Sequence, residues 1–226
     1  MEIPANILDA IRARRSVRQY TDDFIDPVLV NELQKVIDLC NAESGLNIQL
    51  IVDESAAFDG FLARYGWLTG VTDYIAMVGK KTPEAEEACG YYGEHIVLRA
   101  QQLGLNTCWV GGTYKKAKTD FWAAEDEKLH LVIALGYGKN QGIPRRSKGF
   151  DTVADARGGA PEWFKRGIES ALMAPTAMNQ QRFKFTLRGN VVTARAGRGP
   201  YTRIDLGIAK YHFEAAAGKE NFVWGK

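Results

Sequence analysis

LHLVIALGY, residues 129–137, is the clearest candidate for a buried β-strand in this sequence. A short continuous apolar run bounded by turn residues is typical of a strand with both faces covered, and Gly136 and Gly138 mark the end of this one. Two runs upstream, residues 47–53 (NIQLIVD) and 74–79 (YIAMVG), are predicted as further strands. The first two thirds of the chain therefore supply several strands of a sheet.

Helical patterns stand on both sides of these strands. Apolar residues at helical spacing predict helices beginning near Ile7, after Asp26-Pro27, over residues 84–103, after Ala160-Pro161 and over residues 205–217. The last third adds a hairpin of residues 183–187 and 191–195 and a short final strand at 221–224. Residues 138–157 are polar and basic, and we expect them to be irregular. Because helices and strands mix without strict β-α-β alternation, the predicted fold class is α+β.

Composition limits the function classes. The chain has 226 residues and a formal net charge of +2, which is too small to indicate nucleic-acid binding by itself. Its three cysteines are an odd number without a CxxC motif, and its three histidines are scattered, which argues against a disulfide framework and a metal site. No apolar run approaches the roughly 20 residues of a membrane helix. The first residues lack a signal-peptide pattern, so we expect a cytoplasmic location.

The sequence contains a faint internal repeat. The ungapped alignments pair residues 36–49 with 168–181, and residues 91–111 with 205–225. The first alignment matches Asn47 with Asn179, and the second matches Gly93 with Gly207. Their shared order predicts two structurally related halves, about 1–150 and 151–226, within one domain of residues 1–226. The alternative is two unrelated amphipathic helices.

Two basic groups could bind an anion. The first is RRSVR, with Arg14, Arg15, Ser16 and Arg18; the second is Arg145, Arg146 and Lys148. Cations at a helix C-terminus are favourable without any ligand, and a basic loop can simply be solvated. Arginine forks also bind phosphate in a bidentate way that lysine cannot copy, so two such groups can converge on one phosphate.

Two other segments combine small residues with turns. GLNTCWVGG, residues 104–112, is a turn, a short apolar strand and a glycine pair, which either belongs to the core or brings backbone amides close to a flat ligand. Cys108 inside it is better explained as a buried structural thiol than as a redox group. APTAMNQQ, residues 174–181, is either a capped helix end or a loop whose Asn179 hydrogen-bonds a ring.

Taken together, these segments resemble the FMN-dependent nitroreductases. Members of that family have RRSxR near the N-terminus, a loop AP-S-xx-N-x-Q before the first strand, then GLG-TCW-IGG, and a GYP strand end with a basic pair. This chain matches in the same order with residues 14–18, 104–112 and Gly136-Tyr137-Gly138 followed by its second basic group. The resemblance implies a nitroreductase-like fold with a central, mostly antiparallel sheet flanked by helices.

One loop departs from the family. Where the family has its Asn loop, residues 41–47 read NAESGLN, while APTAMNQQ lies in the second half, which has no counterpart of RRSVR. In the family, FMN lies at a homodimer interface, with the Arg-Ser-x-Arg segment from one subunit and the Asn loop from the other. The complementary losses resemble a fused pseudo-dimer with one FMN site, as in the single-chain Thermotoga-type branch. A monomer is therefore possible.

The resemblance also implies roles for the matched residues. Arg14 and Ser16, with Arg15 beside them, would contact the FMN phosphate and ribityl chain, and Arg18 the pyrimidine edge or the phosphate. The remaining cofactor-binding residues would be Arg146 and Lys148 at the phosphate, Val110, Gly111 and Gly112 near the flavin N5, and Pro175, Thr176 and Asn179 at the ring. No catalytic side chain and no metal is implied, because the flavin takes hydride from NADH or NADPH and passes electrons on.

Three functions stay open. The first is an FMN-dependent NAD(P)H oxidoreductase whose partner is a small electron acceptor such as a nitroaromatic or quinone, with no nucleic acid or membrane partner. The second is an FMN-binding sensor or flavin store with little turnover. The third is a nucleic-acid-binding module that uses the basic loop and binds with steep salt dependence. The aromatic residues Phe58, Phe61, Tyr65 and Trp67 would line a substrate pocket or belong to the core.

Overall fold

The computed structural model describes residues 6–58 and 68–225, which form two compact units. The first unit contains residues 13–85 and 96–144, and the second contains residues 1–12, 86–95 and 145–226. Each unit has its own four-stranded sheet. In the described ranges, no helix combines the length and the apolar character that crossing a membrane requires.

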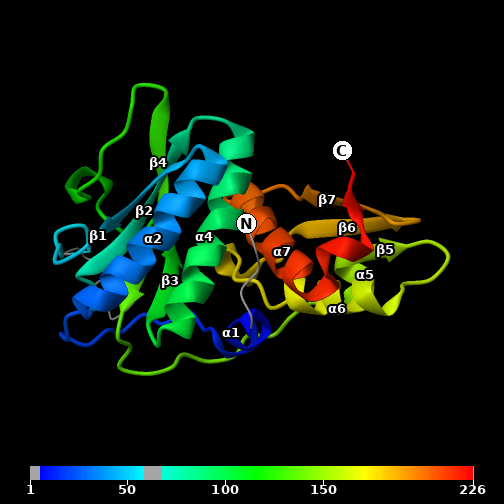
Figure 1. Cartoon of the computed structure of the whole chain (residues 1–226), viewed down its shortest axis with the longest axis horizontal. Coiled ribbons are helices and arrows are strands. Elements are labelled where there is room, and N and C mark those ends of the chain that lie inside the picture. Colours follow the sequence, from blue (N-terminus) through cyan, green and yellow to red (C-terminus); the bar gives the residue numbers. More distant parts are fainter. Residues whose placement is uncertain (1–5, 59–67, 226) are drawn as a thin grey trace. The chain divides into compact units, whose positions relative to one another are not determined.

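The sheet of the first unit is antiparallel throughout. Its strands are β1 (Asn47–Ile51), β2 (Asp73–Lys80), β3 (Asn106–Val110) and β4 (Glu127–Gly136), in the order β1-β2-β4-β3. Strand β4 lies between β2 and β3, and its last eight residues are all buried, which explains its continuous apolar run. Figure 1 shows helix α2 (Pro27–Ser44) crossing this sheet beside β1. The predicted buried strand and antiparallel sheet are confirmed.

Helix α2 has clear start and stop signals. The Asp26 carboxylate accepts a hydrogen bond from the Val28 amide at 2.8 Å, and Pro27 occupies the first turn, where no amide donor is needed. Gly45 ends the helix in the left-handed region with φ 69°, and its amide donates to the Asn41 carbonyl. The predicted start at Asp26-Pro27 is therefore confirmed, for the predicted reason.

Side-chain amides cover the outer edge of β1. Asn41 on α2 both donates to the Ile48 carbonyl (2.9 Å) and accepts from the Ile48 amide (2.7 Å). Gln49 makes the same paired contact with the backbone of Trp122, at 2.6 and 2.9 Å. The Asn41 amide thus occupies, at Ile48, the position that the backbone of a neighbouring strand would take, and the Gln49 amide ties the backbone of Trp122 to β1.

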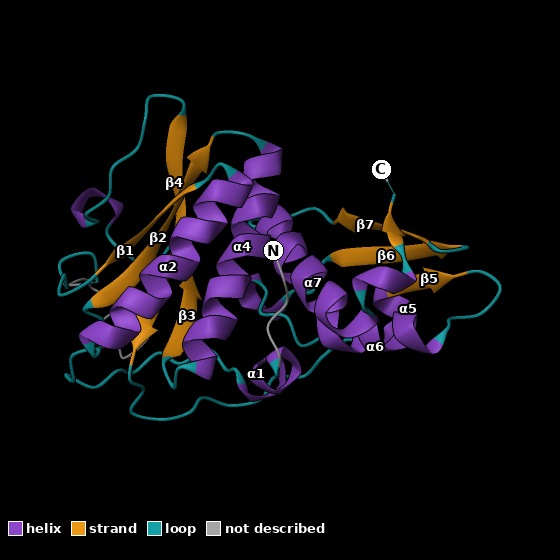
Figure 2. Ribbon diagram, viewed as in Figure 1, coloured by secondary structure: helices purple, strands orange, loops and turns teal. Residues whose placement is uncertain are grey.

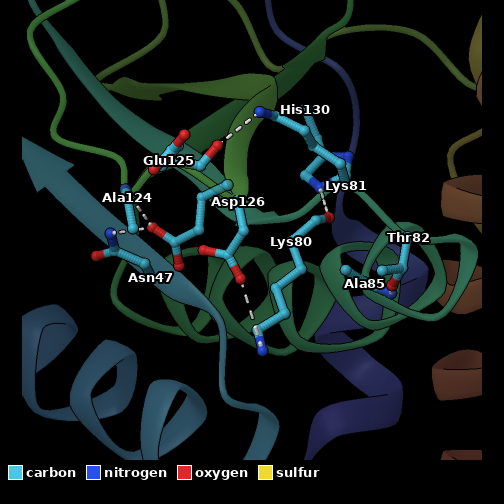
Figure 3. A network of polar contacts seen from close by, with 10 residues as sticks. Asn47, Lys80, Lys81, Thr82, Ala85, Ala124, Glu125, Asp126 and His130 are labelled. Atoms are coloured by element: carbon cyan, nitrogen blue, oxygen red, sulfur yellow. Dashed lines mark hydrogen bonds and ion pairs between the residues drawn. The ribbon is translucent and has the colours of Figure 1, made fainter.

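A polar network joins the turn after β2 to the segment before β4 (Figure 3). The Lys81 amide donates to the Asp126 carbonyl at 3.1 Å, and the His130 ring lies 3.1 Å from the Lys80 carbonyl. Thr82 then caps helix α4 (Pro83–Gln102) by accepting from the Ala85 amide at 3.2 Å. These contacts fix where α4 begins relative to β2 and β4.

The sheet of the second unit is mixed. Its strands are β5 (Ala154–Ala156), β6 (Phe183–Arg188), β7 (Val191–Ala196) and β8 (Val223–Trp224), in that order. Strands β6 and β7 form the predicted antiparallel hairpin, whereas β5–β6 and β7–β8 are parallel pairs. Figure 2 shows helices α6 (Glu162–Ala171) and α7 (Thr202–Ala217), which contact each other beside this sheet.

The prediction that residues 138–157 are irregular is wrong at their C-terminal end. Helix α5 (Phe150–Val153) leads directly into β5. Val153 is fully buried, and the Phe150 ring meets Phe164 of α6 edge-on at 6.2 Å. Three apolar positions in a polar stretch are too few to show a period, so burial against distant residues decides this segment.

Within the second unit, two glycines let α7 cross residues 86–95 of α4 at close range. A Cβ at Gly207 would lie 2.0 Å from the Glu87 carbonyl oxygen, and one at Gly90 would lie 2.0 Å from the Ile204 carbonyl oxygen. The contacts are reciprocal, because Gly207 also faces Tyr91 while Gly90 faces Ile208. Only a residue without a side chain allows two helix backbones to approach so closely.

The three cysteines, Cys40, Cys89 and Cys108, are buried and are not joined by disulfide bonds. Burial raises the pKa of Cys40 to about 12, which keeps this thiol protonated at neutral pH. We expect no cysteine of the folded protein to react with a soluble aromatic disulfide reagent at pH 7.5, and all three to react after unfolding. Absorbance of the released thiolate measures both, and rapid modification of the folded protein would contradict the prediction.

Candidate functional site

The RRSVR segment lies beyond the first helix. Helix α1 (Ile7–Ala13) has only Arg12 as a basic residue in its last turn. After it, the chain extends along the first unit's sheet: Ser16 bridges Thr107 of β3 in parallel, and the Val17 amide donates to the Thr107 carbonyl at 3.0 Å. Stabilisation of a helix C-terminus therefore fits Arg12 and Arg14, which lie at the end of α1, but not Arg15 and Arg18 in the extended segment.

The arginines of this segment differ in exposure. Arg14 is only 7% exposed, whereas Arg15 and Arg18 are half-buried. Arg15 donates to the Arg14 carbonyl at 2.7 Å, and Arg18 donates to the Ser16 carbonyl at 3.4 Å. These local contacts orient the Arg15 and Arg18 side chains.

The segment after β4 packs against Arg15 and the start of β3. Asn106, at the start of β3, accepts from the Gly138 amide at 2.9 Å and donates to Gln141 at 3.1 Å. Gly142 has φ 68°, and a Cβ there would lie 2.7 Å from the Cβ of Arg15. The structure thus brings together three of the sequence motifs, namely RRSVR, the start of β3 and the Gly-Tyr-Gly strand end.

The predicted flavin N5 contacts lie at the other end of β3. Val110 is buried and pairs with Val132, Gly111 is half-buried, and Gly112 is exposed. Thr107, beside Ser16, lies three residues earlier, which corresponds to about 10 Å along a strand. The basic segment and the glycine pair are therefore separated by a distance suited to an elongated ligand. Their predicted roles stay predictions.

The other predicted contacts belong to the second unit. Residues 176–181 form a loop between α6 and β6 that includes the short 3-10 helix η2 (Ala177–Asn179). The Asn179 side chain donates to the Arg146 carbonyl at 2.8 Å. The Lys148 ammonium donates to the carbonyls of Gln180 (2.8 Å) and Gln181 (3.1 Å). The second basic group and the Asn loop are thus directly joined.

These contacts qualify two of the predicted roles. Lys148 uses two of its three ammonium donors on the loop backbone, so its main structural effect is to hold the loop. Arg146 is exposed, and the bond from Asn179 reaches its carbonyl, which leaves its guanidinium out of that contact. Pro175 and Thr176 are half-buried before η2, and Thr176 accepts from the Gln181 amide at 3.1 Å.

Asp205, which no sequence motif pointed to, holds the loop over residues 176–181. It is only 2% exposed and accepts from the Ala177 amide (2.9 Å) and the Gln180 side chain (2.7 Å). Burial raises the pKa of this carboxyl to about 6, against the opposing effect of the two hydrogen bonds. In the sequence, an acid in the first turns of a helix is ordinary, because it favours the helix dipole. No local signal pointed to the loop.

The predicted aromatic pocket is only partly described. Phe58 is buried in the core of the first unit, where its ring meets Tyr74 edge-on at 5.5 Å. This favours the core interpretation for Phe58. Phe61, Tyr65 and Trp67 lie outside the described residues. Within the part of the chain that is described, no group of three or more His, Cys, Asp or Glu residues could hold a metal ion.

An antiparallel four-stranded sheet, with a basic segment along β3 and helices against it, defines a nitroreductase-like α+β protein. A putative nitroreductase structure from Thermotoga maritima is similar, with 20% identity, a TM-score of 0.66 and coverage of 96% of this chain and 85% of that one. A putative nitroreductase in complex with FMN from Exiguobacterium sibiricum has 15% identity, a TM-score of 0.53 and coverage of 68% and 98%. A putative NADH dehydrogenase/NAD(P)H nitroreductase from Parabacteroides distasonis has 17% identity, a TM-score of 0.51 and coverage of 66% and 97%.

The family described as "Putative TM nitroreductase" matches residues 6–217. The chain therefore belongs to this family, and with it to the oxidoreductases. No curated protein matches it in sequence.

Proposed function

We propose that the chain is an FMN-dependent oxidoreductase that takes electrons from NADH or NADPH and passes them to a small acceptor such as a nitroaromatic or a quinone. The observation that carries this proposal is the RRSVR segment, which leaves the end of α1 in an extended conformation and bridges β3 at Ser16 and Thr107. Family membership and the FMN complex of the Exiguobacterium relative support the choice of cofactor. The name of the Parabacteroides relative, which includes NAD(P)H, supports the choice of donor.

The donor set of the first unit fits the chemistry of FMN. A phosphate dianion needs several cations and hydroxyl donors, and Arg14, Ser16 and Arg18 supply both within five positions. Arg18 near the ring would favour the negative charge of a reduced flavin, and the backbone of Val110 to Gly112 would approach N5. When bound, FMN would supply hydride and electron transfer. The chain itself then needs only to bind FMN, orient its ring and polarise it. By the resemblance, Pro175, Thr176 and Asn179 would contact the flavin ring.

The first test is the identity of the bound cofactor. We expect the purified protein, or the apoprotein reconstituted with FMN, to be yellow and to release one FMN per chain on denaturation. Chromatography and the absorption spectrum identify and count the flavin. Release of FAD, or failure to bind FMN after reconstitution, would contradict the proposal. A ratio of two FMN per chain would contradict the single site expected for a fused pseudo-dimer.

The same preparation separates an enzyme from a flavin sensor or store. Under anaerobic conditions, NADH or NADPH should bleach the flavin absorbance, and a quinone or nitroaromatic should restore it. A flavin that stays oxidised with both nicotinamides would instead favour the sensor or store.

A further inference from the structure

The loop over residues 176–181 has an unusual backbone. Met178, Asn179 and Gln181 have φ values of 50°, 53° and 42°, so three non-glycine residues within four positions lie in the left-handed region. Each such residue costs roughly 1 kcal/mol relative to right-handed backbone. A loop of this kind keeps one conformation only when surrounding groups hold it.

Asp205 holds the middle of this loop from the first turns of α7. One carboxylate oxygen accepts from the Ala177 amide and the other from the Gln180 side-chain amide, at 2.9 and 2.7 Å. The Gln180 amide also donates to the Pro200 carbonyl at 2.9 Å, which fixes its orientation. An ionised carboxylate can accept both bonds, whereas a protonated one presents a hydroxyl that competes with one of them.

The other contacts of the loop involve no carboxyl group. Gln181 is 2% exposed, donates to the Leu172 carbonyl at 2.7 Å and accepts from the Lys148 amide at 2.7 Å. The charged side chains of the neighbouring segments are engaged elsewhere: Arg203 with Glu86 at 3.9 Å, Arg182 with the Arg198 carbonyl at 2.8 Å, and Lys148 with the Gln180 and Gln181 carbonyls. Asp205 is therefore the acid whose charge state acts directly on this loop.

We propose that Asp205 is a positioning residue for the flavin site: its ionised carboxylate sets the conformation in which Thr176 and Asn179 meet the cofactor, and its protonation releases that conformation. This inference rests on the proposed FMN function. Asp205 itself contacts no reacting atom. It acts through Ala177 and Gln180, on either side of Asn179.

The pH dependence follows from the position of the carboxyl. Its pKa is raised from 3.8 to about 6, so acidification below about pH 6 protonates it in the folded protein, and flavin affinity falls. The stability of the fold changes in the opposite direction. Between the pKa of about 6 in the folded state and 3.8 in the unfolded state, the folded protein binds the proton more tightly. The Asp205 contribution to the free energy of unfolding therefore rises as pH falls. Loss of affinity in acid is thus separable from loss of fold.

The experiment compares wild type with Asp205→Asn, an isosteric change that removes the charge. Riboflavin is the probe alongside FMN, because the FMN phosphate itself titrates near pH 6. Fluorescence quenching should show riboflavin and FMN binding about tenfold weaker in Asp205→Asn at pH 7.5, the scale of one charged hydrogen bond. Wild-type affinity for riboflavin should fall between pH 7 and pH 5, whereas that of the variant should stay flat. Asp155→Asn is the matched control, because Asp155 is a half-exposed acid of the same unit that pairs with Arg188 at 2.9 Å.

Hydrogen exchange of the apoprotein separates this inference from the proposed function. The amides of residues 177–181 should exchange faster in Asp205→Asn than in wild type, and Asp155→Asn should leave them unchanged. A wild-type chain that binds no flavin would overturn the proposed function and the role toward flavin together, and the exchange data would still show whether Asp205 holds the loop. Wild-type affinity in Asp205→Asn, or a loss that is equal at every pH and follows the melting temperature, would overturn the positioning role alone.

Discussion

Replacing Gly207 with alanine is expected to destabilise the folded protein by about 3 kcal/mol, the upper end of what overpacking a close contact costs. The added Cβ would lie 2.0 Å from the Glu87 carbonyl oxygen and 2.7 Å from the Tyr91 amide nitrogen, both in the backbone of α4. Backbone atoms inside a helix cannot move aside as a flexible side chain would. The clash therefore outweighs the gain of about 1 kcal/mol that alanine brings to a helix.

Urea denaturation followed by circular dichroism measures this change. Gly149→Ala is the matched control, because Gly149 has φ −74° and a Cβ there meets nothing within 4 Å. Gly90→Ala should behave like Gly207→Ala, since its Cβ meets the Ile204 carbonyl at the same distance of 2.0 Å. A Gly207→Ala protein as stable as the Gly149→Ala control would show that α4 and α7 do not cross in this way.

Replacing Arg14 or Arg18 with alanine is expected to weaken FMN binding by about 1.5–3 kcal/mol, the scale of a hydrogen bond to a charged group. This corresponds to an affinity loss of about 10- to 150-fold. The reason is the extended path of the RRSVR segment, which bridges β3 at Ser16 and takes Arg18 away from the end of α1, although Arg14 directly follows that helix. Equilibrium titration of the apoprotein with FMN measures the loss.

Arg12→Ala is the control for these two variants. Arg12 belongs to α1, its side chain is 65% exposed, and it pairs with Asp9 at 3.2 Å. The control should keep wild-type FMN affinity, and the melting temperature of each variant reports whether the fold survives. Because Arg14 is buried, Arg14→Ala can also affect folding. If that variant does not fold, the FMN affinity of Arg18→Ala alone tests the prediction. Unchanged FMN affinity in Arg18→Ala would remove Arg18 from the site.

The sequence predicted those elements that have strong local signals. Strand β4 has a continuous apolar run, and α2 has an acidic cap with a following proline, so both were located correctly. The segment over residues 150–156 has neither, and its helix and strand form because Val153 is buried and the half-buried Phe150 packs against Phe164 of α6. Strand β5 pairs in parallel with β6, and β8 pairs in parallel with β7. Both pairings depend on contacts between segments distant in sequence, which no local pattern predicts.

The site was predictable in its parts rather than in its arrangement. Motif order indicated RRSVR, the start of β3 and the Gly-Tyr-Gly strand end, which the structure brings together. Motif order did not indicate that the Lys148 ammonium would donate to the carbonyls of the loop over residues 176–181. Nor did it indicate that a buried Asp205 would hold that loop. Both depend on where a side chain points after folding, which spacing along the chain does not encode.

The internal repeat stays a prediction. Among the described α-helices and strands, those from α2 to β3 and those from α6 to β8 follow the same order of helix, strand, strand, helix, strand. The reciprocal glycine contact equates Gly90 with Gly207, three residues away from the Gly93 of the sequence alignment. A repeat read from few identities can therefore be right in order and shifted in register.

The side-chain amides along β1 also bear on how this protein behaves in concentrated solution. An open edge strand is a template on which another chain can add a strand, and such additions begin many aggregates. Asn41 and Gln49 occupy the backbone groups of Ile48 and Trp122 in both directions, as donor and as acceptor. A foreign strand would have to displace the Asn41 amide before it could pair with β1 at Ile48, and the Gln49 amide keeps the Trp122 backbone groups occupied beside the same strand.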